Sequence, residues 1–117
     1  MTAPAWSKTD LMYEIFYNPN FIPLPSPKVK VKTTIVDGKP SYLMKDHATG
    51  TYYNLDEETN FVWSLTDGKR TLPQITEEAQ RQRPRIRERT ILEIILFFAE
   101  CNLLVSSLEP APKKRFK

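Results

Sequence analysis

SYLMKDHATGTYYNLDEETNFVWSLTDGKRT, residues 41–71, carries the turn and capping signals that decide the fold. Residues 41–45 and 51–55 are short segments rich in Tyr, Leu and Thr, and the turn-forming residues between them end in Gly50. Strand formers on both sides of such a cluster predict a β-hairpin with a longer loop, in which Gly50 has a positive φ.

Two helices are predicted to follow the hairpin almost at once. Asp56 can cap the first helix, and the glutamates in its first turn complement the helix dipole. Its predicted buried stripe consists of Phe61, Val62 and Leu65. Gly68 ends this helix, and Thr71 with Gln74 forms a capping box that begins the second. The second helix is expected over about residues 72–82.

Upstream of the hairpin, valine and lysine alternate over residues 28–32, which is typical of a half-buried strand. Asp37 and Gly38 form a turn signal that leads into the strand at residue 41. The sequence therefore predicts a small antiparallel sheet of three strands.

A third helix is predicted over about residues 86–100, and it is more apolar than one buried face requires. Its first stripe at helical spacing consists of Ile91, Ile94, Ile95 and Phe98. A second stripe, about 100° round the helix, consists of Leu92, Leu96 and Ala99, with Phe97 on the opposite flank. Asn102 can take the left-handed cap that ends the helix.

The chain of 117 residues is long enough for one compact domain with extensions at both ends. We expect an N-terminal arm over residues 1–27, a domain over residues 28–108 and a basic tail or linker over residues 109–117. The longest apolar run, residues 94–99, is far shorter than the roughly 20 residues of a membrane span. The single cysteine, Cys101, indicates a reducing compartment, and we expect a cytoplasmic protein.

No set of residues predicts catalysis. His47 is the only histidine and lies in a predicted turn, whereas a metal site needs several donors. The chain has no paired cysteines, no H-E-x-x-H and no glycine-rich phosphate loop. We therefore expect no catalytic residues, no cofactor, no metal and no enzymatic activity.

Positive charge is clustered although the net charge is only +3. The clusters are Lys28, Lys30 and Lys32; Arg81, Arg83, Arg85, Arg87 and Arg89; and Lys113, Lys114, Arg115 and Lys117. Such clusters are compatible with a solvated surface or with attraction to an acidic peptide, a nucleic acid or a membrane surface.

The combined pattern resembles the PqqD-like family of recognition elements for ribosomally made, post-translationally modified peptides. The resemblance covers about residues 28–105. It is carried by Tyr53-Asn54-Leu55-Asp56, by residues 61–63, by Asp67-Gly68-Lys69-Arg70-Thr71, and by Ile94-Ile95, Phe98 and Asn102-Leu103-Leu104. Two features depart from the family: Asn102 stands where a glycine is common, and the N-terminal arm is longer.

The resemblance implies an α+β, winged-helix-like fold, with a three-stranded antiparallel sheet followed by a three-helix bundle. It also implies a non-catalytic domain that binds the leader segment of a precursor peptide as an added strand and presents it to a modifying or processing enzyme. The implied binding residues are Thr51, Tyr52, Tyr53, Asn54 and Leu55 on the third strand, and Arg89, Leu92, Leu96 and Ala99 on the third helix, which would form a groove.

Four alternatives stay open. The chain could be a winged-helix nucleic-acid-binding regulator that uses Arg83, Arg85, Arg87 and Arg89 on phosphates. It could be a structural docking domain of a larger enzyme or membrane protease, continuing past Lys117, or it could form a homodimer. Finally, Met12, Ile15 and Phe16 of the N-terminal arm could cover the second stripe of the third helix.

Overall fold

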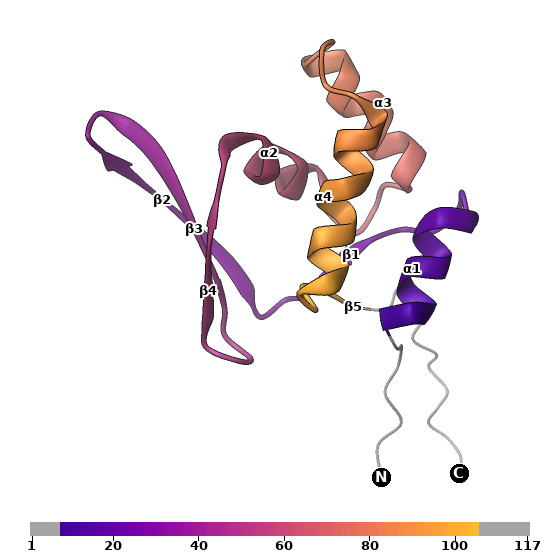
Figure 1. The fold of residues 1–117 in the computed structure, drawn as a ribbon, viewed down its shortest axis with the longest axis horizontal. Coiled ribbons are helices and arrows are strands. Elements are labelled where there is room, and N and C mark those ends of the chain that lie inside the picture. Colours follow the sequence, from indigo (N-terminus) through magenta and orange to yellow (C-terminus); the bar gives the residue numbers. More distant parts are fainter. Residues whose placement is uncertain (1–7, 106–117) are drawn as a thin grey trace, which may run out of the picture.

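The structure, a computed structural model, describes residues 8–105, with side chains from Asp10 onward. Figure 1 shows α4 at the centre, with the β2–β4 sheet on one side and α1 on the other. In chain order the elements are α1 (Lys8–Tyr17), β1 (Leu24–Pro25), β2 (Val29–Val36), β3 (Lys39–Asp46), β4 (Thr51–Leu55), α2 (Glu57–Leu65), α3 (Leu72–Gln82), α4 (Glu88–Glu100) and β5 (Leu104–Val105).

The predicted sheet is confirmed as an antiparallel sheet with strand order β2-β3-β4. β2 and β3 form a long hairpin whose turn residues, Asp37 and Gly38, have φ values of 54° and 78°. Two consecutive positive φ angles are typical of the tight turns that suit twisted strands. Gly50, in the β3–β4 loop, has the predicted positive φ of 79°.

The predicted caps are also confirmed. The carboxylate of Asp56 accepts the Thr59 N–H at 2.7 Å, and this hydrogen bond holds the pKa of Asp56 below its ordinary value. Thr71 and Gln74 form the reciprocal capping box. Asn102 takes the left-handed conformation at the end of α4, with φ 59°.

The third predicted helix begins two residues later than expected. Ile86 is buried like a helical core residue, but its N–H bonds to the Arg83 carbonyl in the turn before α4. Arg87 is extended and serves as the N-cap residue without a side-chain hydrogen bond. Ile86 thus fits the helical spacing of apolar residues because it is buried, although it lies in the turn before the helix.

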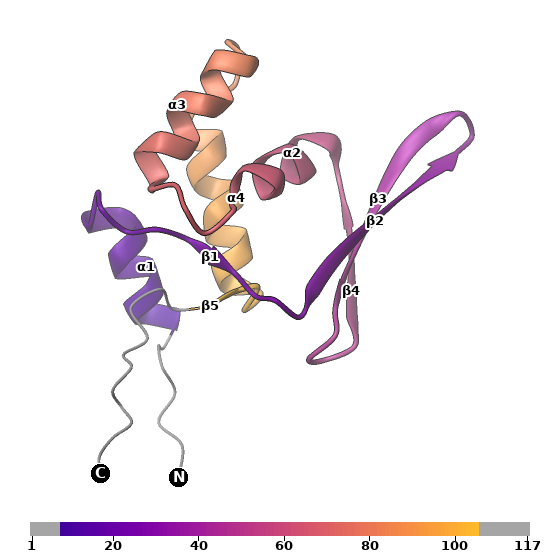
Figure 2. The same cartoon turned by 180° about the vertical axis from the view of Figure 1, so that it is seen from behind.

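The N-terminal arm packs against the domain. Leu11 and Ile15 of α1 are buried, and α1 lies along α4. Beyond α1, Phe21 is only 2% exposed, and β1 pairs with β5 in a two-stranded antiparallel sheet. Figure 2 shows this pairing beside the lower end of α4. The expected basic tail, residues 109–117, lies outside the described residues.

One hydrophobic core joins these layers around α4. The largest fully buried side chains are Phe98, Met44, Ile75, Ile91, Ile95, Leu103, Val62 and Pro23. They come from the sheet, from α2, α3 and α4, and from the segments after α1 and after α4. The α+β fold class, a three-stranded antiparallel sheet followed by helices, is confirmed. Within the described part of the chain, no helix has the length and hydropathy needed to cross a membrane.

Candidate functional site: the edge of β4 and the flanks of α4

The outer edge of β4 is an open edge of the sheet within residues 8–105. β4 pairs with β3 on one side, and no described strand pairs with it on the other. An unpaired edge presents backbone donors and acceptors that another extended chain can bind. It is therefore the first candidate site.

The strand register shows which residues of β3 form backbone hydrogen bonds with β2 and which with β4. His47, the residue after β3, donates its N–H to the Lys28 carbonyl at 2.8 Å, on the β2 side. Successive residues of a strand direct their backbone groups to opposite sides. Met44, three positions before His47, therefore bonds towards β4.

The partner of Met44 in β4 is Tyr53. Tyr53 consequently directs its N–H and C=O towards β3, whereas Tyr52 and Asn54 direct theirs towards the open edge. An added strand would bond to these two residues.

A contact between aromatic rings joins β4 to α4. The rings of Tyr53 and Phe97 meet edge to face, with centroids 6.1 Å apart and planes at 89°. Cys101, one turn after Phe97, lies beside the Tyr53 hydroxyl. Burial, and then the neighbouring Cys101, raise the pKa of the Tyr53 phenol above its ordinary value of 10.0. We call Tyr53, Phe97 and Cys101 the β4–α4 seam.

The seam rests on a second layer of aromatic side chains. Phe97 contacts Phe98 with ring centroids 5.8 Å apart, and Phe98 meets Trp63 of α2 edge to face at 5.0 Å. Phe98 is fully buried. Edge-to-face pairs are favourable ring arrangements, so this layer holds Phe97 in place beside β4.

The structure separates the predicted site residues into two groups. The strand residues lie at the candidate edge: Thr51, Tyr52 and Asn54 are exposed, Tyr53 is half-buried and Leu55 is buried. The helix residues are Arg89, Leu92, Leu96 and Ala99. Arg89 is exposed, Leu92 and Leu96 are half-buried, and Ala99 is 1% exposed.

The predicted role of Leu92, Leu96 and Ala99 as the groove wall beside the third strand stays a prediction. Leu92 and Arg89 line a hollow beside α1, and Phe97 of α4 contacts Tyr53 of β4. Adjacent helix residues point about 100° apart, so Leu96 lies between these two flanks. The sequence signal that could have identified Phe97 was its place beside Phe98 in the apolar run.

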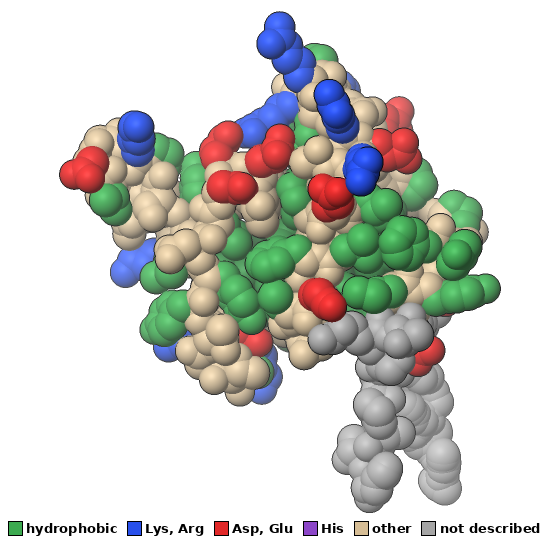
Figure 3. All heavy atoms as spheres, viewed as in Figure 1, with side chains coloured by type: hydrophobic (Ala, Val, Ile, Leu, Met, Phe, Trp, Pro, Cys, Tyr) green, Lys and Arg blue, Asp and Glu red, His purple; other side chains and the backbone are tan. Residues whose placement is uncertain are grey.

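The alternative that the N-terminal arm covers the second stripe is partly confirmed. Ile15 is 5% exposed and lines the same hollow as Leu92. Met12 is half-buried, whereas Phe16 remains 54% exposed. α1 therefore lies on this flank without sealing it. Figure 3 shows hydrophobic side chains continuing from the sheet across α4 to α1 on one face.

Two of the four arginines predicted to bind phosphate are paired with glutamates. Arg83 forms an ion pair with Glu57, and its guanidinium lies 4.0 Å from the centroid of the Phe61 ring. Arg89 pairs with Glu93 at 3.3 Å. Lys28, Lys30 and Lys32 lie at or just before β2, two strands away from the open edge of β4. Among residues 8–105, no positive cluster therefore lies directly beside that edge.

His47 is exposed in the β3–β4 loop. Among the described residues, no group of three or more His, Cys, Asp or Glu side chains is placed to hold a metal ion.

Comparison with solved structures finds the same fold in another protein. No family model matches the chain, and no curated protein matches it. A solved structure described as TbiB1 in complex with the TbiA(beta) leader peptide matches with a TM-score of 0.51 and 20% sequence identity. The match covers 69% of this chain and 93% of that chain. The likeness confirms the fold that the PqqD-like resemblance implied.

Proposed function

We propose that this chain is a non-catalytic peptide-binding protein that takes the leader segment of a ribosomally made precursor as a fourth strand beside β4. The observation that carries the proposal is the open β4 edge lying next to the β4–α4 seam. The fold shared with TbiB1, whose solved structure holds a leader peptide, supports it. In this proposal the chain presents the bound leader to a modifying or processing enzyme.

The energetics fit a reversible interaction. Tyr52 and Asn54 offer outward N–H and C=O groups, each hydrogen bond contributing about 0.5–1.5 kcal/mol net. Apolar leader side chains packed on the seam would contribute about 1.5–3 kcal/mol each. Ordering a flexible leader costs about 2–5 kcal/mol, and association costs translational freedom. The balance corresponds to an affinity of about micromolar.

The leader need not be strongly acidic. The lysines of β2 are two strand spacings, about 10 Å, from the open edge, which is close to the screening length at 0.1 M salt. Steering by these lysines would therefore be modest at physiological ionic strength. The lone Cys101 supports a reducing compartment such as the cytoplasm.

The test removes one outward donor from the β4 edge. In Tyr52→Pro the lost N–H points away from β3, so the β3–β4 ladder keeps its hydrogen bonds. We expect the affinity for the leader of the precursor peptide that this chain serves, measured by fluorescence anisotropy, to fall at least about tenfold. The TbiA(beta) leader serves as a second probe.

Two variants control for side effects. Tyr52→Ala removes the same exposed side chain and keeps the N–H, and it should bind the leader within about threefold of the parent chain. Thr33→Pro makes the matching change on β2, whose outward N–H faces the other edge of the sheet, and it should not change leader affinity. Equal losses in Tyr52→Pro and Thr33→Pro, or no binding by the parent chain, would refute strand addition at β4.

A further inference from the structure

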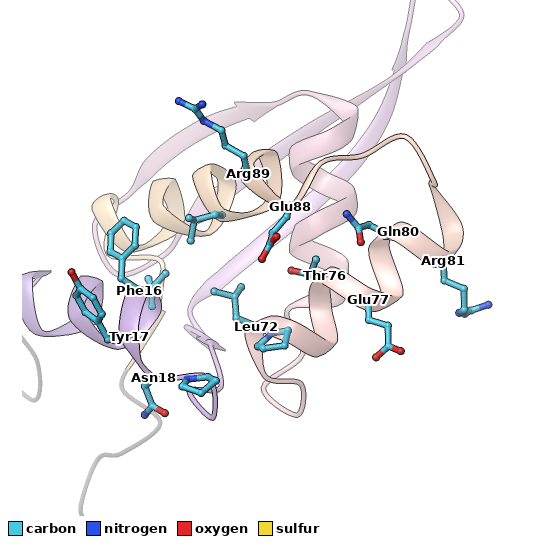
Figure 4. Close-up of a pocket in the computed structure, with 14 residues that line it drawn as sticks. Phe16, Tyr17, Asn18, Leu72, Thr76, Glu77, Gln80, Arg81, Glu88 and Arg89 are labelled. Atoms are coloured by element: carbon cyan, nitrogen blue, oxygen red, sulfur yellow. The ribbon is translucent and has the colours of Figure 1, made fainter.

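A second candidate surface lies on the other flank of α4. α1, α3 and the first turns of α4 enclose an open hollow of about 900 Å³. We call it the α1–α3–α4 hollow, and Figure 4 shows Phe16 and Tyr17 of α1 on one side of it and Leu72 and Thr76 of α3 on the other. The β4–α4 seam contributes no residue to its lining. The hollow is therefore separate from the proposed leader site.

The hollow has an apolar base and exposed aromatic walls. Ile15, Leu72 and Leu92 form apolar parts of its lining, and Ile15 is nearly fully buried. Phe16 and Tyr17 on the wall are 54% and 70% exposed, with ring centroids 6.3 Å apart. Exposed apolar surface of this kind, gathered around a concavity, is typical of an interaction site.

The charges on the rim determine what kind of partner fits. Each arginine that lines the hollow forms an ion pair with a glutamate that does not line it. Arg81 pairs with Glu78, and Arg89 pairs with Glu93. The two lining glutamates, Glu77 and Glu88, form no ion pair with any described residue, and Glu77 also borders a neighbouring hollow that Lys69 and Arg70 line.

Glu88 lies between α3 and α4, opposite Leu72 and Thr76 (Figure 4). It is also in the first turn of α4, where a negative charge complements the helix dipole. Glu88 therefore places a carboxylate, without an ion pair among the described residues, beside the apolar surface of the hollow.

We propose that the α1–α3–α4 hollow is a docking site for a partner protein segment that presents a large apolar side chain next to a lysine or arginine. The apolar side chain would enter between Leu72 and Leu92, and the cation would pair with Glu88, assisted by Glu77 at the rim. This site does not depend on leader binding, because it uses the opposite flank of α4.

The probe is a short amphipathic helical peptide with leucines on one face and lysines beside them. A matched peptide carries glutamates in place of the lysines. We expect the lysine peptide, titrated into the full chain, to shift the amide NMR signals of Ile15, Thr76 and Leu92 but not those of Tyr52 and Asn54. The glutamate peptide should not shift them. A chain whose hollow signals do not respond to the lysine peptide would overturn the proposal.

The decisive variant is the double change Glu77→Gln with Glu88→Gln, which keeps size and removes the two carboxylates. We expect about fivefold weaker binding of the lysine peptide, the upper range for partly exposed ion pairs. The matched control is Glu58→Gln, an exposed glutamate in the first turn of α2 outside the hollow, which should leave binding unchanged. If the double variant and Glu58→Gln bind the lysine peptide equally well, the carboxylates of the hollow do not contribute to binding.

Two other occupants would contradict the proposal, and the same experiments detect them. The chain itself presents an apolar residue next to a lysine at the β2–β3 tip, where Val36 is 54% exposed beside Lys39. Self-association that Val36→Asp abolishes in sedimentation velocity would make a second copy the occupant. Nuclear Overhauser contacts from residues 106–117 to Leu92 in the free chain would show that the chain fills its own hollow.

Discussion

Phe97 links the core to the candidate leader site at the scale of single residues. Its ring contacts Tyr53 on one side and the buried Phe98 on the other. A leader strand paired to β4 would place alternate side chains over this surface, since side chains of a strand alternate between its faces. Phe97 should therefore contribute more to leader affinity than any residue on the α1 flank of α4.

The prediction compares two truncations on the same helix. Phe97→Ala should weaken leader binding about tenfold, because it removes an apolar contact worth roughly 1.5 kcal/mol to a bound side chain. Leu92→Ala, on the α1 flank, should leave leader affinity within about twofold. Calorimetric titration of both folded variants with the leader measures the difference. A larger loss in Leu92→Ala would return the site to the flank first expected from the sequence.

At the scale of elements, local signals were predictable and long-range contacts were not. The Asp56 cap, the Thr71–Gln74 capping box and the left-handed Asn102 each depend on a few neighbouring residues, so their patterns were sufficient. The pairing of β1 with β5 joins residues about 80 positions apart and has no local signature.

The side of α4 that faces β4 is likewise a property of the topology. The apolar residues on both flanks of α4 indicate that each flank packs against another element. The pattern does not identify the element that packs on each flank. α1 takes the flank of Leu92 and β4 takes the flank of Phe97. The strand half of the candidate site was therefore predictable, whereas the contact of Phe97 with β4 was not.

A glycine at the α2–α3 joint shows how β1 constrains the helices. Gly68 has φ 78°, and a Cβ on it would lie 2.5 Å from the Leu24 side chain of β1. Gly50 has almost the same φ, 79°, with open space around it. The two positions therefore share the cost of a positive φ and differ in the contact with β1.

Gly68→Ala should destabilise the chain more than Gly50→Ala. Both alanines incur about 1–2 kcal/mol from the left-handed conformation, and only the one at position 68 must also displace Leu24. We expect an additional loss of about 1 kcal/mol in the unfolding free energy of Gly68→Ala, measured by urea denaturation. Equal losses of unfolding free energy in Gly68→Ala and Gly50→Ala would mean that β1 moves away from position 68 without an energetic cost.

At the scale of the whole molecule, the positive clusters within residues 8–105 lie at separate places. Arg85 and Arg87 are exposed in the turn between α3 and α4, whereas the lysines of β2 lie on the sheet. Figure 3 shows Lys and Arg side chains near the upper end of α3 and α4 and, apart from these, around the sheet. A nucleic-acid-binding surface usually gathers its cations into one patch or stripe that follows the phosphates.

Duplex DNA binding tests this distribution directly. Because the arginines at positions 83 and 89 are paired with glutamates, we expect only weak non-specific binding, with a dissociation constant of about 10⁻⁴ to 10⁻⁶ M at physiological salt.

The double variant Arg85→Ala with Arg87→Ala should keep leader affinity within about twofold, since both residues lie in the turn before α4 and outside the β4–α4 seam. A mobility-shift titration across salt concentrations, run beside the leader titration, measures both properties. Nanomolar, strongly salt-dependent DNA binding that this variant loses would instead identify the chain as a nucleic-acid-binding protein, because only phosphate contacts would give that salt dependence.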